Sequence, residues 1–284
     1  MHRHSRIDSR PWRSGSAAYR ASCAAGPTRR AVLGGSAAAL GSAALGGFGR
    51  AAQPEVLRLS TAFGPPIFAT DGSGFFNMLM SEAAQRIGVA VEIDAPPAER
   101  ALVNANAGIV DGDGPRIHDL RDIGSYPNLL RVPEVLIVVE FTAFSRARPV
   151  SAEDWSSLFP YNVGIVRGWK ILEQNITEAR SLVRAKTARQ LFGLLASERI
   201  EVAVIDRLSG LAAARELSII DIAVADRALA RRPMYLHMHK RHAGLIEPLG
   251  TVLAQMKADG TYARIESAAL GPYLASDVPK ARRP

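Results

Sequence analysis

Two carboxylates, one guanidinium and three glycines fall within a short stretch near the middle of the chain. Residues 107–117 read Ala-Gly-Ile-Val-Asp-Gly-Asp-Gly-Pro-Arg-Ile and supply Asp111, Asp113 and Arg116. An apolar pair followed by two Asp-Gly steps predicts a buried strand that ends in a tight turn. Ligands of open α/β sheets bind outside the carboxyl ends of strands, so we expect this turn to face a binding site. A solvated surface turn is the alternative.

Arg116 is the first candidate for ligand contact. Its planar guanidinium can bind a carboxylate through two parallel hydrogen bonds. The alternative is an internal ion pair with Asp111 or Asp113, or a solvated turn. The glycines of this stretch are expected to let the backbone approach the ligand.

Three more candidates lie where strands are predicted to end. Arg167 precedes a helix that begins at Gly168, and the free N–H groups of a helix start favour an anion; a surface arginine is the alternative. Trp169 is either a wall of the cleft or a packing residue. Asp206 suits a ligand ammonium group and can also cap the helix that follows, and these two roles are compatible.

Phe63 and Phe68 flank a Pro-Pro step and form either an apolar wall of the site or packing beneath the loop. Arg100 and Glu134 are weaker candidates, since a helix surface and a salt bridge explain them as well. His237 and His239 share one face of a predicted strand, but no acid or thiol accompanies them, so we assign no metal site and no cofactor.

The first 52 residues are predicted to be an export signal. They contain eight arginines and one acid, which leaves 27 basic and 26 acidic side chains in the remainder and gives no charge argument for binding nucleic acid. Arg29-Arg30 precede a weakly apolar run to Phe48, and small residues for cleavage follow, so the segment resembles a twin-arginine signal. An uncleaved membrane anchor is the alternative. The only cysteine, Cys23, lies within this segment, so the mature chain has no disulfide.

Strands and helices alternate after residue 53, which is typical of parallel βαβ units. The long β-branched segment 129–144 is expected to cross from one domain to the other, and a helix is expected to start at Ser151, which can cap it. Both halves repeat the same rhythm, so the sequence predicts two similar α/β lobes. The predicted strands are 56–61, 89–93, 107–117, 162–166, 181–185 and 202–205, with extended segments at 219–224 and 233–240. The predicted helices are 74–87, 99–106, 115–122, 187–197, 208–217 and 245–257, with one more from 168 and a frayed tail from 272.

The order of several motifs resembles the family 3 extracellular solute-binding proteins, the periplasmic receptors of amino-acid ABC importers. The motifs are the strand 56–61 with its aromatic-proline loop, the Gly-x-x-Asp step at 108–111, the strand-turn 164–168, the strand end 202–206 and the segment 256–262. The resemblance implies a type II two-lobed periplasmic-binding-protein-like fold, in which each lobe is a mostly parallel sheet flanked by helices. It divides the chain into a discontinuous first lobe, 53–143 plus 236–284, and a second lobe, 144–235.

The same resemblance implies the function. A monomeric, periplasmic receptor would bind a small anionic or zwitterionic solute, an amino acid or a carboxylate, in an interlobe cleft and pass it to a membrane permease. The family's Ser/Thr-x-x-Arg element reads Asp113-Gly-Pro-Arg116 here, which lacks the hydroxyl and leaves the solute open. The alternatives are a dehydratase-like enzyme on the same fold, with Glu134 or Asp111 as its acid, and a sensory protein that acts in trans on a membrane kinase.

Overall fold

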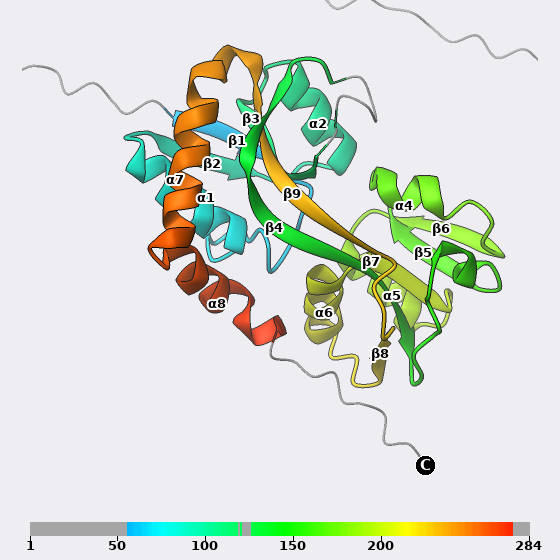
Figure 1. Cartoon of the computed structure of the whole chain (residues 1–284). Coiled ribbons are helices and arrows are strands. Elements are labelled where there is room, and N and C mark those ends of the chain that lie inside the picture. The colour runs from blue at the N-terminus through cyan, green and yellow to red at the C-terminus, as the bar shows by residue number, and fades with distance from the viewer. Residues whose placement is uncertain (1–55, 119, 121–125, 275–284) are drawn as a thin grey trace, which may run out of the picture. The chain divides into compact units, whose positions relative to one another are not determined.

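A long antiparallel pair of strands runs through the middle of one mixed sheet (Figure 1). The computed structural model describes residues 56–118, 120 and 126–274, so the predicted export signal lies outside the described residues. The central pair consists of β4 (Leu129–Arg146) and β9 (Ala230–His239). Beyond β9 follow, in order, β3 (Gly112–Ile117), β1 (Val56–Ser60) and β2 (Ala90–Asp94). Beyond β4 follow β7 (Val202–Asp206), β5 (Asn162–Val166) and β6 (Ser181–Ala185), and the short β8 (Ile222–Val224) pairs with the end of β4.

Each side of the sheet is a parallel set of three strands. β1 pairs in parallel with β2 and β3, and β5 pairs in parallel with β6 and β7. The strands of the central pair run antiparallel to each other and to the neighbouring strands β3 and β7. This is the arrangement expected for two βαβ lobes joined by crossing strands.

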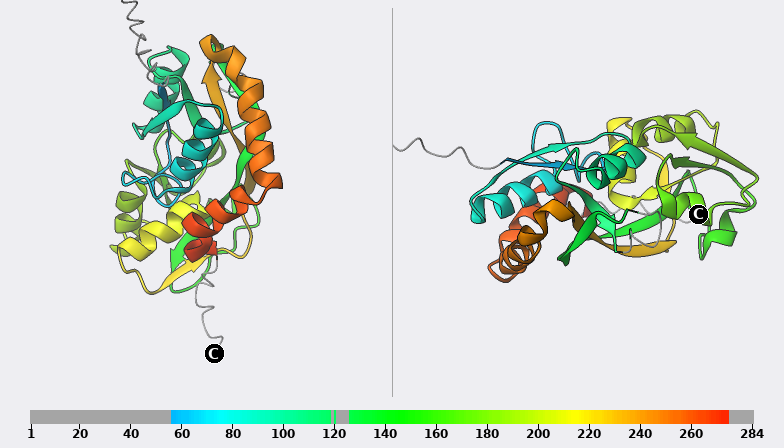
Figure 2. Two further views of the ribbon diagram at one scale, coloured as in Figure 1. Left: turned by 90° about the vertical axis from the view of Figure 1, so that its left-hand side faces the viewer. Right: turned by 90° about the horizontal axis from the view of Figure 1, so that it is seen from above.

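Helices flank both parallel sets. On the side of β1, α1 (Phe75–Arg86), α7 (Ile246–Ala258) and α8 (Thr261–Leu274) pack against one another, and α2 (Ala98–Asn106) packs on β1 and β3 (Figure 2). On the side of β5, α5 (Ala188–Ala196) packs on α6 (Arg207–Glu216). Shorter turns of helix complete the described chain: η1 (Trp155–Leu158), α4 (Lys170–Asn175) and η2 (Lys240–Leu245).

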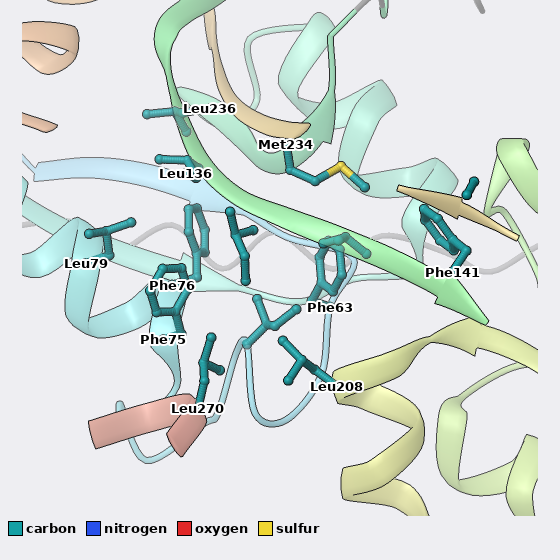
Figure 3. Packing of buried hydrophobic residues seen from close by; sticks show 14 of the residues in the cluster. Phe63, Phe75, Phe76, Leu79, Leu136, Phe141, Leu208, Met234, Leu236 and Leu270 are labelled. Carbon is teal, nitrogen blue, oxygen red and sulfur yellow. The ribbon is translucent and has the colours of Figure 1, made fainter. Parts of the chain in front are cut away.

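The larger core lies between α1 and the central strands. Phe75, Phe76 and Leu79 of α1 are fully buried and meet Leu136 of β4 and Leu270 of α8 (Figure 3). Their spacing places them on one face of the helix. Each of these side chains contributes roughly 1.5–3 kcal/mol by leaving water, so this face fixes α1 to the sheet.

The third strand differs from its prediction. Residues 107–111 are a loop, in which Ile109 is 65% exposed, and the predicted turn is itself the strand β3. A Cβ on Gly112 would lie 2.7 Å from the carbonyl oxygen of His237, so glycine is required here for close packing against β9. The predicted helix from Pro115 is wrong as far as Ile117, and residues 119, 121 and 122 of it lie outside the described residues.

Two predicted boundaries also change. Asp154, and not Ser151, caps η1, because its carboxylate accepts hydrogen bonds from the N–H groups of Ser156 (2.9 Å) and Ser157 (3.1 Å). The tail predicted from Pro272 is still helical to Leu274. Among the described residues, no helix has both the length and the apolar character that a membrane crossing requires.

The predicted lobe boundaries fall inside the central pair of strands. Residues 143 and 144 lie within β4, and residues 235 and 236 lie within β9. We keep the division into 53–143 plus 236–284 and 144–235 as a proposal, with β4 and β9 as the connections between the lobes.

The packing of α6 gives a first prediction. A Cβ on Gly210 would lie 2.3 Å from the ring of the buried Phe144, whereas a Cβ on Gly193 of α5 would meet nothing within 4 Å. Gly210→Ala should therefore lower the free energy of unfolding by about 1–3 kcal/mol. Gly193→Ala should raise it by about 0.5–1 kcal/mol, because alanine is the better helix former. Urea denaturation of both variants measures this, and equal effects would contradict the packing described for α6.

Candidate functional site

A mostly apolar pocket lies between the two parallel sets of strands. Its wall includes Phe63, which follows β1, Arg116 of β3, Phe141 of β4 and Met234 of β9. The loop between β5 and α4 closes it from the other side with residues 168–171. The cavity volume is about 60 Å³, and the pocket is partly open to solvent. Since roughly 10–15 Å³ of such volume holds one water molecule, the pocket in this state has room for a few waters.

Three aromatic rings meet at this pocket. Trp169, at the start of α4, packs edge to face on Phe63, with ring centroids 4.9 Å apart, and on Phe141, at 5.5 Å. Phe63 and Phe141 are buried. The predicted residues Phe63 and Trp169 thus lie together at the pocket. Phe141 was not predicted, because the long apolar strand around it does not indicate which of its positions face a pocket.

Arg116 lines the pocket and is held by its neighbours. Its Nε donates to the Asp113 carboxylate, and its Nη2 donates to the carbonyl oxygen of Ala98 at 3.1 Å. Asp113 is fully buried and also accepts a hydrogen bond of 3.0 Å from the Ser60 hydroxyl. The internal pair with Asp113, one of the two alternatives for Arg116, is therefore present. A guanidinium has five N–H donors, and among the described residues none accepts from Nη1.

The pair between Arg116 and Asp113 balances two opposing effects. Burial raises the pKa of the Asp113 carboxyl, while the adjacent guanidinium of Arg116 opposes that rise. Removing one partner would leave a buried charge without compensation, which is strongly destabilising. The pair thus fixes the guanidinium in position at the pocket wall.

A second ion pair joins the two sides of the pocket. Lys170, at the start of α4, lies 2.8 Å from Glu99 of α2, and the Tyr126 hydroxyl donates to the same carboxylate at 3.1 Å. The Glu99 carboxylate holds the pKa of Lys170 above its usual value. Gly168, next in this loop, has φ of 84° and packs close to α2, where a Cβ would lie 3.2 Å from that of Ala98. No local sequence signal indicated this contact, since its residues come from distant segments.

Asp111 does not line the pocket. It lies just before β3, where it accepts a hydrogen bond of 2.7 Å from the N–H of Arg58 and pairs with Arg241 and His242 of η2. Although burial opposes it, these hydrogen bonds hold the pKa of Asp111 below its usual value. Glu134, the other acid considered for catalysis, pairs with Lys257 at 2.6 Å and also lies outside the pocket lining.

The remaining predicted residues also lie outside the lining. Asp206 is buried and caps α6, accepting from the N–H of Ser209 at 2.9 Å, and burial raises its pKa to about 6. Phe68 is buried away from the pocket. Arg167 is exposed, and its guanidinium has no hydrogen-bond or ion-pair partner among the described residues. A role for these three in ligand binding stays a prediction.

The histidines of β9 do not form a metal centre with other described residues. The described part of the chain contains no group of three or more histidine, cysteine, aspartate or glutamate side chains that could hold a metal ion. His237 is buried, with its Nε2 3.4 Å from the carbonyl oxygen of His118, and burial lowers its pKa to about 4. It is therefore a neutral core residue at neutral pH.

Comparison with known proteins places this geometry in a fold. No family model matches the chain. An uncharacterized protein of Shewanella oneidensis is 27% identical over 210 residues, which cover 69% of this chain and 76% of that protein.

Three solved structures resemble the chain. An ancestral arginine-binding protein bound to glutamine has a TM-score of 0.66 at 20% identity and matches 77% of this chain and 99% of its own. A histidine kinase sensor domain similar to periplasmic binding proteins has a TM-score of 0.67 at 19% identity, over 77% and 97% of the two chains. An ancestral amino-acid-binding protein described as a precursor of cyclohexadienyl dehydratase has a TM-score of 0.60 at 17% identity, over 75% and 93%. The predicted type II periplasmic-binding-protein-like fold is thus confirmed.

The buried carboxyl of Asp206 predicts a pH effect on stability. Its pKa is about 6 in the folded chain against an ordinary value of 3.8, so the folded state holds the proton more tightly and loses stability as the pH rises through that window. Asp206→Asn keeps a capping oxygen without the charge. The stability of the variant relative to the natural chain should increase by on the order of 2–3 kcal/mol between pH 4 and pH 8. Chemical denaturation at several pH values tests this, and a difference that does not vary with pH would refute it.

Proposed function

We propose that this protein is a periplasmic solute-binding receptor that captures a small anionic or zwitterionic solute and passes it to the membrane permease of an ABC importer. The observation that supports the proposal best is the position of Arg116. It lines a pocket between the two parallel sets of strands, is fixed by Asp113, and keeps its Nη1 group for a ligand. A fixed guanidinium at an apolar wall suits a carboxylate, which it can bind with little loss of conformational entropy.

Opening and closing of the pocket follows from the same arrangement. The cavity of about 60 Å³ is small, and the pair of Glu99 with Lys170 bridges its two sides. A hinge within β4 and β9 would separate the sides, admit the solute and bury it again on closure. The proposed lobe boundaries within these two strands agree with that motion.

The proposed location and partners rest on further features. The arginine-rich segment 1–52 supports export to the periplasm, cleaved or as an anchor, and the similar solved structures include an arginine-binding protein and a sensor domain similar to periplasmic binding proteins. We propose a monomer without cofactor, whose partner is a membrane permease. The sensory alternative is supported by the similarity to a histidine kinase sensor domain, and binding of the loaded protein to a kinase rather than a permease would identify it.

An enzymatic role has less support from the geometry. A cleft acid should lie near the bound substrate with a raised pKa. The acids considered for this role, Asp111 and Glu134, both form ion pairs outside the pocket lining. We therefore propose a binding protein and not a dehydratase.

Substitution of Arg116 tests the proposed function. Thermal-shift screening against amino acids and carboxylates would first identify a solute. Arg116→Ala should then weaken its binding by about 1.5–3 kcal/mol, the value of a charge-assisted hydrogen-bonding contact, as measured by isothermal titration calorimetry. Arg184→Ala, at an exposed position of β6, is the matched control and should leave the dissociation constant unchanged.

A second variant separates binding from folding. Arg116→Ala leaves the Asp113 carboxylate buried without its partner, so the double variant Arg116→Ala/Asp113→Asn removes that charge as well. A folded double variant that binds the solute as tightly as the natural chain does would reject Arg116 as a ligand-binding residue. Absence of any stabilising solute in a broad panel would reject the receptor function itself.

A further inference from the structure

We infer that the solute carries a single carboxylate on an apolar or aromatic body, and that the pocket discriminates against a second carboxylate and against a cationic side chain. This inference rests on the proposed receptor function and names the class of solute. It follows from two features of the pocket, the nature of its walls and the pairing of its charged side chains.

The walls are almost entirely apolar. Rings and aliphatic side chains come from both parallel sets and from the central strands, and the pocket-lining residues of this kind include Phe63, Leu102, Ile117, Phe141, Trp169 and Met234. The rings of Phe63 and Trp169 meet edge to face, which is the geometry in which another flat apolar group can join the cluster. A polar solute body placed here would lose its hydrogen bonds to water without replacement.

In the described part of the lining the charged side chains are both cations, and both are already paired. Arg116 pairs with the Asp113 carboxylate. Lys170 pairs with Glu99 at 2.8 Å and lies 3.8 Å from Glu173. Among the described residues nothing accepts from the Nη1 group of Arg116, which can therefore donate to one anionic group. A second carboxylate would have to displace Glu99 from Lys170.

A cationic group finds no partner in the lining. Among the described residues that line the pocket there is no aspartate or glutamate, and the nearby carboxylates Asp113 and Glu99 are each committed to a cation. A buried charge without a partner is costly, so a guanidinium or ammonium side chain of the solute is disfavoured. Apolar monocarboxylic acids without an amino group therefore have the required chemistry, whereas the α-ammonium group of a neutral apolar amino acid would find no acidic partner among the described residues of the lining.

Calorimetry on the natural chain tests the class of solute. The panel contains 3-phenylpropionate, L-phenylalanine and L-leucine against L-glutamate and L-arginine at pH 7. At least one of the first three should bind about tenfold or more tightly than both charged amino acids. The comparison of 3-phenylpropionate with L-phenylalanine shows whether the solute also carries an ammonium group.

Each outcome has a distinct meaning. Glutamate or arginine binding as tightly as the apolar solutes would overturn the inference and leave the receptor function in place. Failure of the whole panel to bind would overturn the inference, and the broad thermal-shift panel would then decide the receptor function.

A variant tests the role of the internal pairs. Glu99→Gln removes the carboxylate that occupies Lys170, so the affinity for phenylsuccinate, which adds a second carboxylate, should rise about tenfold relative to 3-phenylpropionate. Glu247→Gln on the exposed side of α7 removes the same charge far from the lining and should leave this ratio unchanged. A ratio that Glu99→Gln does not change would show that the pairing of Lys170 does not exclude the second carboxylate.

Discussion

The antiparallel pairing of β4 with β9 is the interaction on which the rest of the structure depends. It runs from Leu129 opposite His239 to Phe141 opposite Ala230 and carries a parallel set of strands on each side. Because the two sets are joined through this pair, residues from distant parts of the chain meet at one pocket. The shape of the pocket is therefore determined by the central strands and only then by the loops that close it.

The close packing of β3 on β9 places the principal charged group of that pocket. Gly112 has no room for a side chain, so β3 lies directly against its neighbour. This position buries Asp113, and the buried carboxylate in turn holds Arg116 at the wall. Ser60 of β1 completes the set, so one interaction of the sheet explains the place of the guanidinium.

Regular elements were predictable from the sequence where local patterning decides the structure. The strand 162–166 and the strand 181–185 agree with β5 and β6, and Thr187 caps α5 at the predicted start. The third strand was predicted with misplaced bounds because the glycines and proline of 112–115 read as a turn, although Gly112 is required by contact with β9, which the local sequence does not show. The site, too, was predicted only in part, because some of its contacts join segments that are distant in the sequence. Arg116, Phe63 and Trp169 lie at the pocket, whereas Glu99 and Lys170 meet only through the packing of α2 against the loop before α4.

The order of the strands along the chain has a consequence for folding. The residues of β9 follow those of all the other described strands, yet β9 lies between β3 and β4 in the sheet. Until residues 230–239 are in place, both of these strands present unpaired edges, and exposed edges favour association with other chains. Contacts so distant in sequence also form slowly. Completion of the sheet by β9 is thus expected to be a late folding event, and the chain is most prone to aggregation before it.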